Sequence, residues 1–153
     1  MKKRFFASVL SLVMLLSLLP TAAFAAEGTS TGVAKIGDTT YTSLTDAISA
    51  ATKGQTVTLL ADVNGQTVIP AQEDIILDLN GKTASNTGIP LVNNGTLTVK
   101  DTTGNGKIVS TGNAGIAVGN DSTTVIESGT IESVEGAVIT GLATGATINI
   151  KDG

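Results

Sequence analysis

The chain has 153 residues with no cysteine and no histidine, and it carries 18 glycines against 3% aromatic residues. Disulfide and thiolate chemistry are therefore excluded, and the usual acid/base group near neutral pH is missing. The length predicts one domain, and the abundance of Gly, Thr, Val and Ile favours short strands with tight turns over long helices.

The N-terminal segment, 1–25, has the form of a signal peptide. Residues 2–4 are basic, residues 7–19 form an apolar run that Pro20 ends, and Ala23-Phe24-Ala25 has a small residue on each side of Phe24. This pattern predicts cleavage between Ala25 and Ala26. The run is shorter than the roughly 20 residues that span a bilayer, which disfavours a retained anchor. We therefore expect a protein that is secreted or attached to the cell wall or cell surface.

Cleavage changes the charge of the chain. It removes Lys2, Lys3 and Arg4, which leaves six lysines against 13 acidic residues and a net charge of −7. Phosphate contacts need clustered Lys or Arg, and anionic lipid surfaces attract basic segments. We therefore expect no nucleic-acid partner, and no membrane contact once the signal has been removed.

A flexible lead and a cap precede the main body. Residues 26–32 are rich in Gly, Ser and Thr, which is typical of a flexible segment. In residues 33–55, Gly37-Asp38 indicates the turn of a hairpin, and a helix of about ten residues follows. The helix has an apolar face of Leu44, Ala47, Ile48 and Ala51. Ser43 suits its N-cap, while Lys53 is expected in its last turn and Gly54 just after it.

Residues 56–153 repeat a short alternating pattern. Ile-Ile-Leu-Asp-Leu-Asn-Gly at residues 75–81 has later copies at 97–100, 124–127 and 148–151, each followed by a glycine. Leu79, Val99, Ile126 and Ile150 are taken as equivalent, and their spacing falls within the roughly 20–50 residues that are typical of a solenoid repeat. The β-branched strands and polar turns indicate a β-solenoid. With about three strands a coil, the fold class expected is all-β, a right-handed parallel β-helix with a short N-terminal capping helix. We expect the coils to continue beyond Gly153.

Four segments in order resemble a known group of proteins. They are Tyr-Thr-Ser-Leu-Thr-Asp-Ala-Ile-Ser-Ala-Ala (41–51), Gly-Gln-Thr-Val-Thr-Leu-Leu-Ala-Asp-Val (54–63), Leu-Asp-Leu-Asn-Gly-Lys-Thr (77–83) and Gly-Thr-Leu-Thr-Val-Lys-Asp (95–101). The series resembles the N-terminal part of large secreted β-helix proteins of Gram-positive bacteria. These share the pectate-lyase-like fold and are described as cell-surface or adhesin-like. The resemblance implies a surface scaffold, although fold alone does not fix function.

The same fold also carries polysaccharide lyases and glycoside hydrolases. Enzymes similar to these use acidic calcium ligands with an Arg or Lys base, or clustered aspartates with a histidine. The mature chain has no Arg or His, and its acidic residues are spread singly along the sequence. This disfavours an enzyme, and we predict no catalytic residue and no cofactor. The alternative is that this is the N-terminal portion of such an enzyme, with catalytic coils beyond Gly153.

One metal site can be considered. Asp78, Asp101 and Glu127 occupy similar places in three copies of the repeat, so they are the calcium candidates. Lys100 and Lys151 fill the nearest equivalent places, however, so the row would be mixed in charge. A solvated face is the favoured interpretation.

The expected partners are an extracellular glycan or a host or cell-surface component. Sugar binding usually needs aromatic platforms, and Tyr41, the sole aromatic residue of the mature chain, is expected to pack over the helix instead. Residues 102–106, Thr-Thr-Gly-Asn-Gly, predict a protruding loop that could contact a partner or be a plain loop. A third hypothesis is end-to-end self-association through the open last coil.

Overall fold

A computed structural model of the chain describes residues 31–141 and 144–151. The predicted signal peptide and its cleavage position, Ala25 to Ala26, lie outside the described residues, as does most of the predicted flexible lead. The helix in the described part of the chain is too short to cross a membrane.

A hairpin and a helix precede the first coil. Strands β1 (Ala34–Ile36) and β2 (Thr39–Tyr41) are antiparallel and joined by the predicted turn at residues 37–38. Helix α2 (Leu44–Ala50) has Ser43 as its N-cap, whose hydroxyl accepts the N–H of Asp46 at 3.0 Å. Its predicted apolar face, including Ala51 just after the helix, is buried in the core. Tyr41 also packs against that core, as expected.

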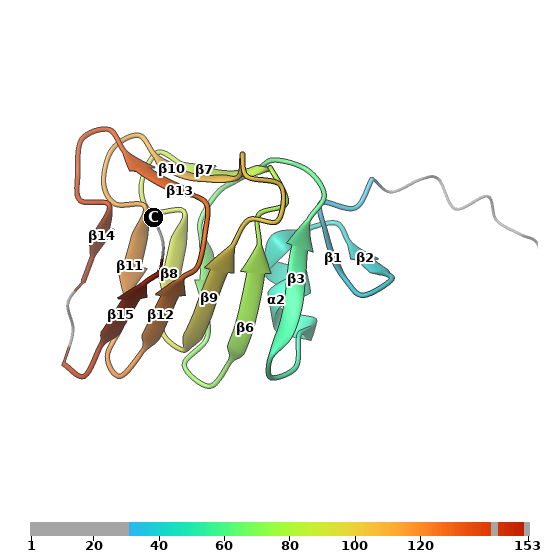
Figure 1. Ribbon diagram of the computed structural model, residues 1–153, viewed down its shortest axis with the longest axis horizontal. Helices are drawn as coiled ribbons and strands as arrows, with labels where there is room; N and C mark the ends of the chain where they lie inside the picture. The colour runs from blue at the N-terminus through green and yellow to red at the C-terminus, as the bar shows by residue number, and fades with distance from the viewer. Residues whose placement is uncertain (1–30, 142–143, 152–153) are drawn as a thin grey trace, which may run out of the picture. The chain divides into compact units, whose positions relative to one another are not determined.

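Twelve further strands form four coils of three strands each, and β15 follows them. The coils are β3 (Gln55–Leu59), β4 (Val63–Asn64) and β5 (Thr67–Ile69); β6 (Asp74–Asp78), β7 (Thr83–Asn86) and β8 (Leu91–Asn93); β9 (Thr96–Lys100), β10 (Lys107–Ser110) and β11 (Ile116–Val118); and β12 (Thr123–Ile126), β13 (Thr130–Ser133) and β14 (Ile139–Thr140), with β15 at Thr147–Ile150. Figure 1 shows equivalent strands of successive coils side by side.

The strands build three sheets. Sheet A has the order β15-β12-β9-β6-β3-β1-β2, sheet B the order β13-β10-β7-β4, and sheet C the order β14-β11-β8-β5. All pairings between coils are parallel, and β1 pairs antiparallel with β3. The predicted parallel β-solenoid with a short helix before it is therefore confirmed.

The core consists of aliphatic columns that run from coil to coil. In sheet A, Val57 pairs with Leu77, Leu77 with Val99, and Val99 with Ile126. The first three are fully buried, and Ile126 is 6% exposed. Alternate strand positions face opposite sides, so Ile76 faces outward between buried neighbours.

Two details of the sequence prediction are wrong. Leu79 is not the equivalent of Val99, because the register of the parallel strands pairs Leu77 with Val99. Leu79 is buried just after the strand ends. The helix ends at Ala50 with Ala51 as C-cap, so it is shorter than expected and Lys53 lies beyond its last turn. The N–H of Ala51 bonds back to the carbonyls of Ala47 and Ile48, while Gly54 takes a positive φ in the following turn.

The last strands of the three sheets are less buried than their predecessors. Ile108 and Ile116 of the third coil are fully buried, whereas their register partners Ile131 and Ile139 are only partly covered. Ile150 in β15 is 66% exposed. In the middle of the stack a column has a neighbouring coil on each side, whereas β13, β14 and β15 each pair with one strand within residues 31–141 and 144–151.

Candidate functional site

Asp78 ties one coil to the next at the corner between sheets A and B. Its Oδ1 accepts the N–H of Asn80 at 3.0 Å, which shapes the turn in its own coil. The same oxygen accepts the N–H of Thr102 at 3.1 Å and the hydroxyl of Thr102 at 3.2 Å, from the following coil. The side chain is 5% exposed, so these donors replace the water that the carboxylate loses.

Asp101, which follows β9, joins the same two coils from the other side. Its Oδ1 accepts the N–H of Gly81 at 2.8 Å and both the N–H and hydroxyl of Thr103, and its Oδ2 accepts the N–H of Gly106 at 2.6 Å. Burial acts to raise the pKa of Asp101, but the hydrogen bonds from Gly106, Gly81 and Thr103 outweigh it and hold the pKa below its ordinary value. A Cβ at residue 106 would lie 2.8 Å from the Asp101 carboxyl carbon, so this contact requires glycine.

The third calcium candidate lies elsewhere on the surface. Asp78 pairs in register with Lys100, and because Val99 pairs with Ile126, the next residue, Glu127, is level with Lys100. Glu127 forms an ion pair with Lys151 at 3.1 Å. The row is therefore mixed in charge, as the sequence suggests, and Asp101 lies one residue beyond it.

The three candidates thus have different surroundings. Two are buried acceptors, and the third is an exposed partner of a lysine. Within residues 31–141 and 144–151, no three acidic residues lie close enough together to hold a metal ion. Calcium binding by Asp78, Asp101 and Glu127 stays a prediction that a titration can decide.

The predicted loop at residues 102–106 is exposed over its first four residues and buried at Gly106. Its two threonines are held by Asp78 and Asp101, and Gly106 is held by Asp101. Hydrogen bonds therefore fix both ends of the loop. Gly104 and Asn105 at its tip are exposed and accessible to a partner.

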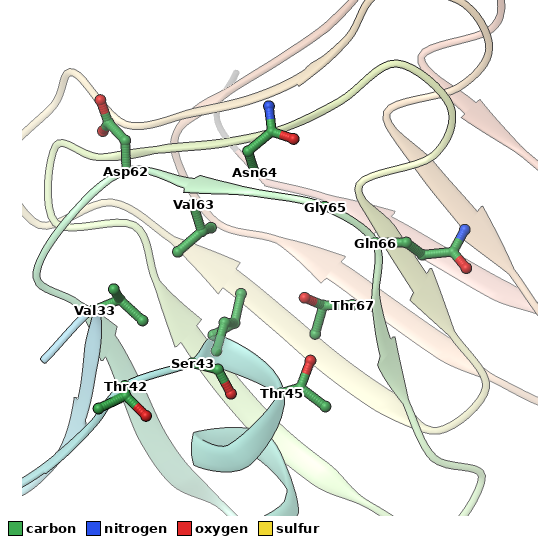
Figure 2. Close-up of a pocket in the computed structure, with 11 residues that line it drawn as sticks. Val33, Thr42, Ser43, Thr45, Asp62, Val63, Asn64, Gly65, Gln66 and Thr67 are labelled. Carbon is green, nitrogen blue, oxygen red and sulfur yellow. The ribbon is translucent and has the colours of Figure 1, made fainter.

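A groove of about 260 Å³ lies between the start of α2 and the first coil. Figure 2 shows Val33 and Val63 facing each other across it, with the hydroxyls of Ser43, Thr45 and Thr67 nearby. Helix α2 supplies one wall and the β4–β5 segment supplies the other. Strand β3 separates these elements along the chain, so no local pattern in the sequence indicates the groove.

The polar residues on the rim of the groove bind the next coil. Asp62 accepts the N–H of Thr83 at 2.8 Å, and the amide of Asn64 donates to the hydroxyl of Ser85 at 3.3 Å. In Figure 2 both side chains point away from the helix. Asp62 is the single charged residue among those lining the groove. The groove therefore offers hydroxyl groups over an apolar floor, which suits hydrogen bonding to a small polar ligand and lacks a pair of groups for acid/base catalysis.

The fold and these contacts define the class as a parallel β-solenoid whose polar side chains join its coils. Comparisons with protein-family models, curated proteins and solved structures find no match to the chain.

Proposed function

We propose that the protein is a secreted or cell-surface, adhesin-like β-helix scaffold that displays loops for contact with an extracellular glycan or surface component. The N-terminal sequence supports export, and the four coils support a scaffold. The resemblance to surface β-helix proteins of Gram-positive bacteria agrees with both. The proposal does not depend on calcium or on any cofactor.

The observation that carries the proposal is the use of buried polar groups to join coils. Asp78 and Asp101 bind backbone N–H groups of neighbouring coils, as described above. Asn93 is fully buried in β8, and its amide donates to the carbonyl of Thr123 at 2.9 Å and the hydroxyl of Thr124 at 2.8 Å. In the described ranges, no buried side-chain N or O atom lacks a hydrogen-bond partner. These groups fix the relative position of successive coils, which is what a stiff support needs.

Export is tested by expressing the full chain in a Gram-positive host and determining the N-terminus of the protein in the medium and wall fractions. The expected product begins at Ala26. Ala25→Phe should block cleavage, because signal peptidase requires a small residue there, whereas Ala22→Phe is a matched control outside the cleavage motif. An intact chain that stays inside the cell would refute the proposal.

A second experiment distinguishes glycan binding from glycan cleavage. The secreted protein is incubated with pectic and mucin-type glycans, and both bound protein and released fragments are measured. Scaffold function predicts binding without bond cleavage. Thr45→Trp should close the groove and reduce binding if the groove is used, and Thr98→Trp, on the outer face of sheet A, is its control. Fragment release would instead favour the alternative, a polysaccharide lyase or glycoside hydrolase.

A further inference from the structure

The outward side of sheet C is free of charge. Its four strands, β5, β8, β11 and β14, contain no Asp, Glu, Lys or Arg. By contrast, sheets A and B carry charges that meet in pairs. Lys107 in β10 binds Glu132 in β13 at 2.7 Å, and Lys151 after β15 binds Glu127 after β12 at 3.1 Å.

Small aliphatic side chains form a column across this face. Val68 pairs in register with Val92, Val92 with Ala117, and Ala117 with Thr140. Val68, Val92 and Ala117 each lie between buried neighbours and therefore point outward, and Thr140 is level with Ala117 at the less buried end of the column. Val68 is 43% exposed, and Val138, just before β14, is 48% exposed. We call the column of Val68, Val92, Ala117 and Thr140 the neutral face.

The segments that border the neutral face carry acidic residues and no basic ones. Glu73 and Asp121 lie in the connections that lead to sheet A, and Glu135 lies in the connection that enters β14. Asp121 and Glu135 are exposed. Lys53, in the turn after α2, is level with Glu73 because Gln55 pairs with Ile75, and the other five lysines of the mature chain lie in the cap or along sheets A and B. Asp121 and Glu135 therefore carry the negative charge of the border. The neutral face is therefore an apolar strip with a negative border.

We propose that the neutral face is a docking surface for a basic polypeptide segment that places aliphatic side chains on the strip and Lys or Arg beside the acidic border. Apolar contact alone would favour any hydrophobic partner, but the border selects a positively charged one. A second copy of the chain docked through its own neutral face would bring Asp121 and Glu135 against like charges. An anionic lipid surface would meet the same repulsion. This surface is separate from the groove and does not rest on the proposed display function.

The test uses a synthetic peptide of alternating Val and Lys, with a peptide of alternating Val and Glu as its control. Binding to the secreted protein, labelled with ¹⁵N, is followed by chemical-shift changes of backbone amides. The proposal expects shifts centred on the outward positions Val68, Val92 and Ala117 for the basic peptide. Screening of the border charges should weaken binding about fivefold between 50 and 500 mM NaCl.

Two pairs of variants locate the site. Val92→Lys on the neutral face should weaken binding by about tenfold through like-charge repulsion. Thr98→Lys, an outward position of the same stack on sheet A, adds the same charge elsewhere and should change it less than about twofold. If Val92→Lys disturbs the fold, Glu135→Lys serves instead, with Asp38→Lys in the β1–β2 turn as its control.

Several results would overturn the proposal. Equal weakening by Val92→Lys and Thr98→Lys would show that net charge alone governs binding. Equal affinity for the acidic peptide would refute the role of the border. Shifts confined to the groove or to sheet A, self-association through sheet C, or no binding of the basic peptide at millimolar concentration would each refute the site.

Discussion

Asp78 accepts two hydrogen bonds from Thr102 of the next coil, one from its backbone N–H at 3.1 Å and one from its hydroxyl at 3.2 Å. The contact joins two successive coils at the corner between sheets A and B. Asp101, in the later of these coils, accepts the N–H of Gly81 in the earlier one and also binds Thr103 and Gly106 of its own coil. Charged acceptors form stronger hydrogen bonds than neutral ones, so this corner with its two carboxylates is expected to be a major contributor to the stability of the stack.

Asp101→Asn should therefore destabilise the protein. The amide keeps the shape of the side chain but loses the charge, and its NH₂ group would face an N–H donor. We expect the free energy of unfolding in urea to fall by about 2 kcal/mol. Asp121→Asn is the control, because Asp121 is exposed and its positive φ of 53° suits Asn equally well. Equal midpoints for the two variants would contradict the role given to Asp101.

Stability should also depend on pH through Asp101. Its folded-state pKa is lower than its unfolded value, so the folded state binds fewer protons. The stabilisation is then fully present above the unfolded value of about 3.9 and is lost as the pH falls through the lower, folded pKa. Thermal unfolding of the wild type between pH 7 and pH 2 should show a loss that Asp101→Asn lacks below pH 4. Parallel pH profiles for the two proteins would refute this.

Core positions and outward positions should respond differently to truncation. Leu77 is fully buried between Val57 and Val99, so Leu77→Ala leaves a cavity and should cost about 2–5 kcal/mol of unfolding free energy. Ile76→Ala, at the preceding position and facing outward, should cost less than about 1 kcal/mol. Similar losses for both variants in urea unfolding would mean that the alternation in β6 is incorrect.

Hydrogen exchange should report the uneven burial of the coils. Ile108 in β10 is fully buried, whereas its register partner Ile131 in β13 is partly buried and β13 pairs with β10 alone in the described part of the chain. Amides of β13 should exchange at least about tenfold faster than those of β10, because opening the last coil breaks fewer apolar contacts. Equal protection would indicate that another molecule, such as a second copy, covers the last coil.

Calcium should not stabilise the protein through Asp78, Asp101 and Glu127. Two of these carboxylates already accept protein hydrogen bonds and the third binds Lys151. A site with a dissociation constant of about 10 μM would add about 2.7 kcal/mol at about 1 mM calcium. We expect the same unfolding midpoint in calcium at that concentration and in EDTA. A rise that Asp78→Asn abolishes would restore the calcium hypothesis.

The sequence predicts the coil architecture well because its signal is local and repeated. Alternating aliphatic residues and the glycine after each copy determine strands, turns and the inward direction of side chains. The register is harder to predict, because Leu77 and Leu79 lie on either side of Asp78 and either could match Val99. Only the pairing of strands between coils shows that Leu77 is the match for Val99. Asp101 is therefore not among the equivalent positions that include Asp78 and Glu127.

The surfaces that could bind partners are less accessible to sequence reasoning. The groove unites α2 with β4 and β5, and the neutral face appears only when four short strands are set side by side. The absence of charge in 66–70, 89–94, 114–119 and 137–141 is visible in the sequence. It becomes meaningful once those segments are known to share one sheet, since isolated uncharged strands are common in any β protein.

The reversed direction of β1 distinguishes the N-terminal end of the stack from the rest of it. Every coil pairs with the next one in parallel, whereas β1 runs antiparallel to β3 and α2 packs beside the β1–β2 hairpin. New coils can therefore be accommodated by duplication within the stack or after β15, without rebuilding the cap. Each added coil would lengthen the support by about 4.8 Å. Variation in reach among descendants of this chain, or among engineered versions, can thus accumulate while the start of the fold stays the same.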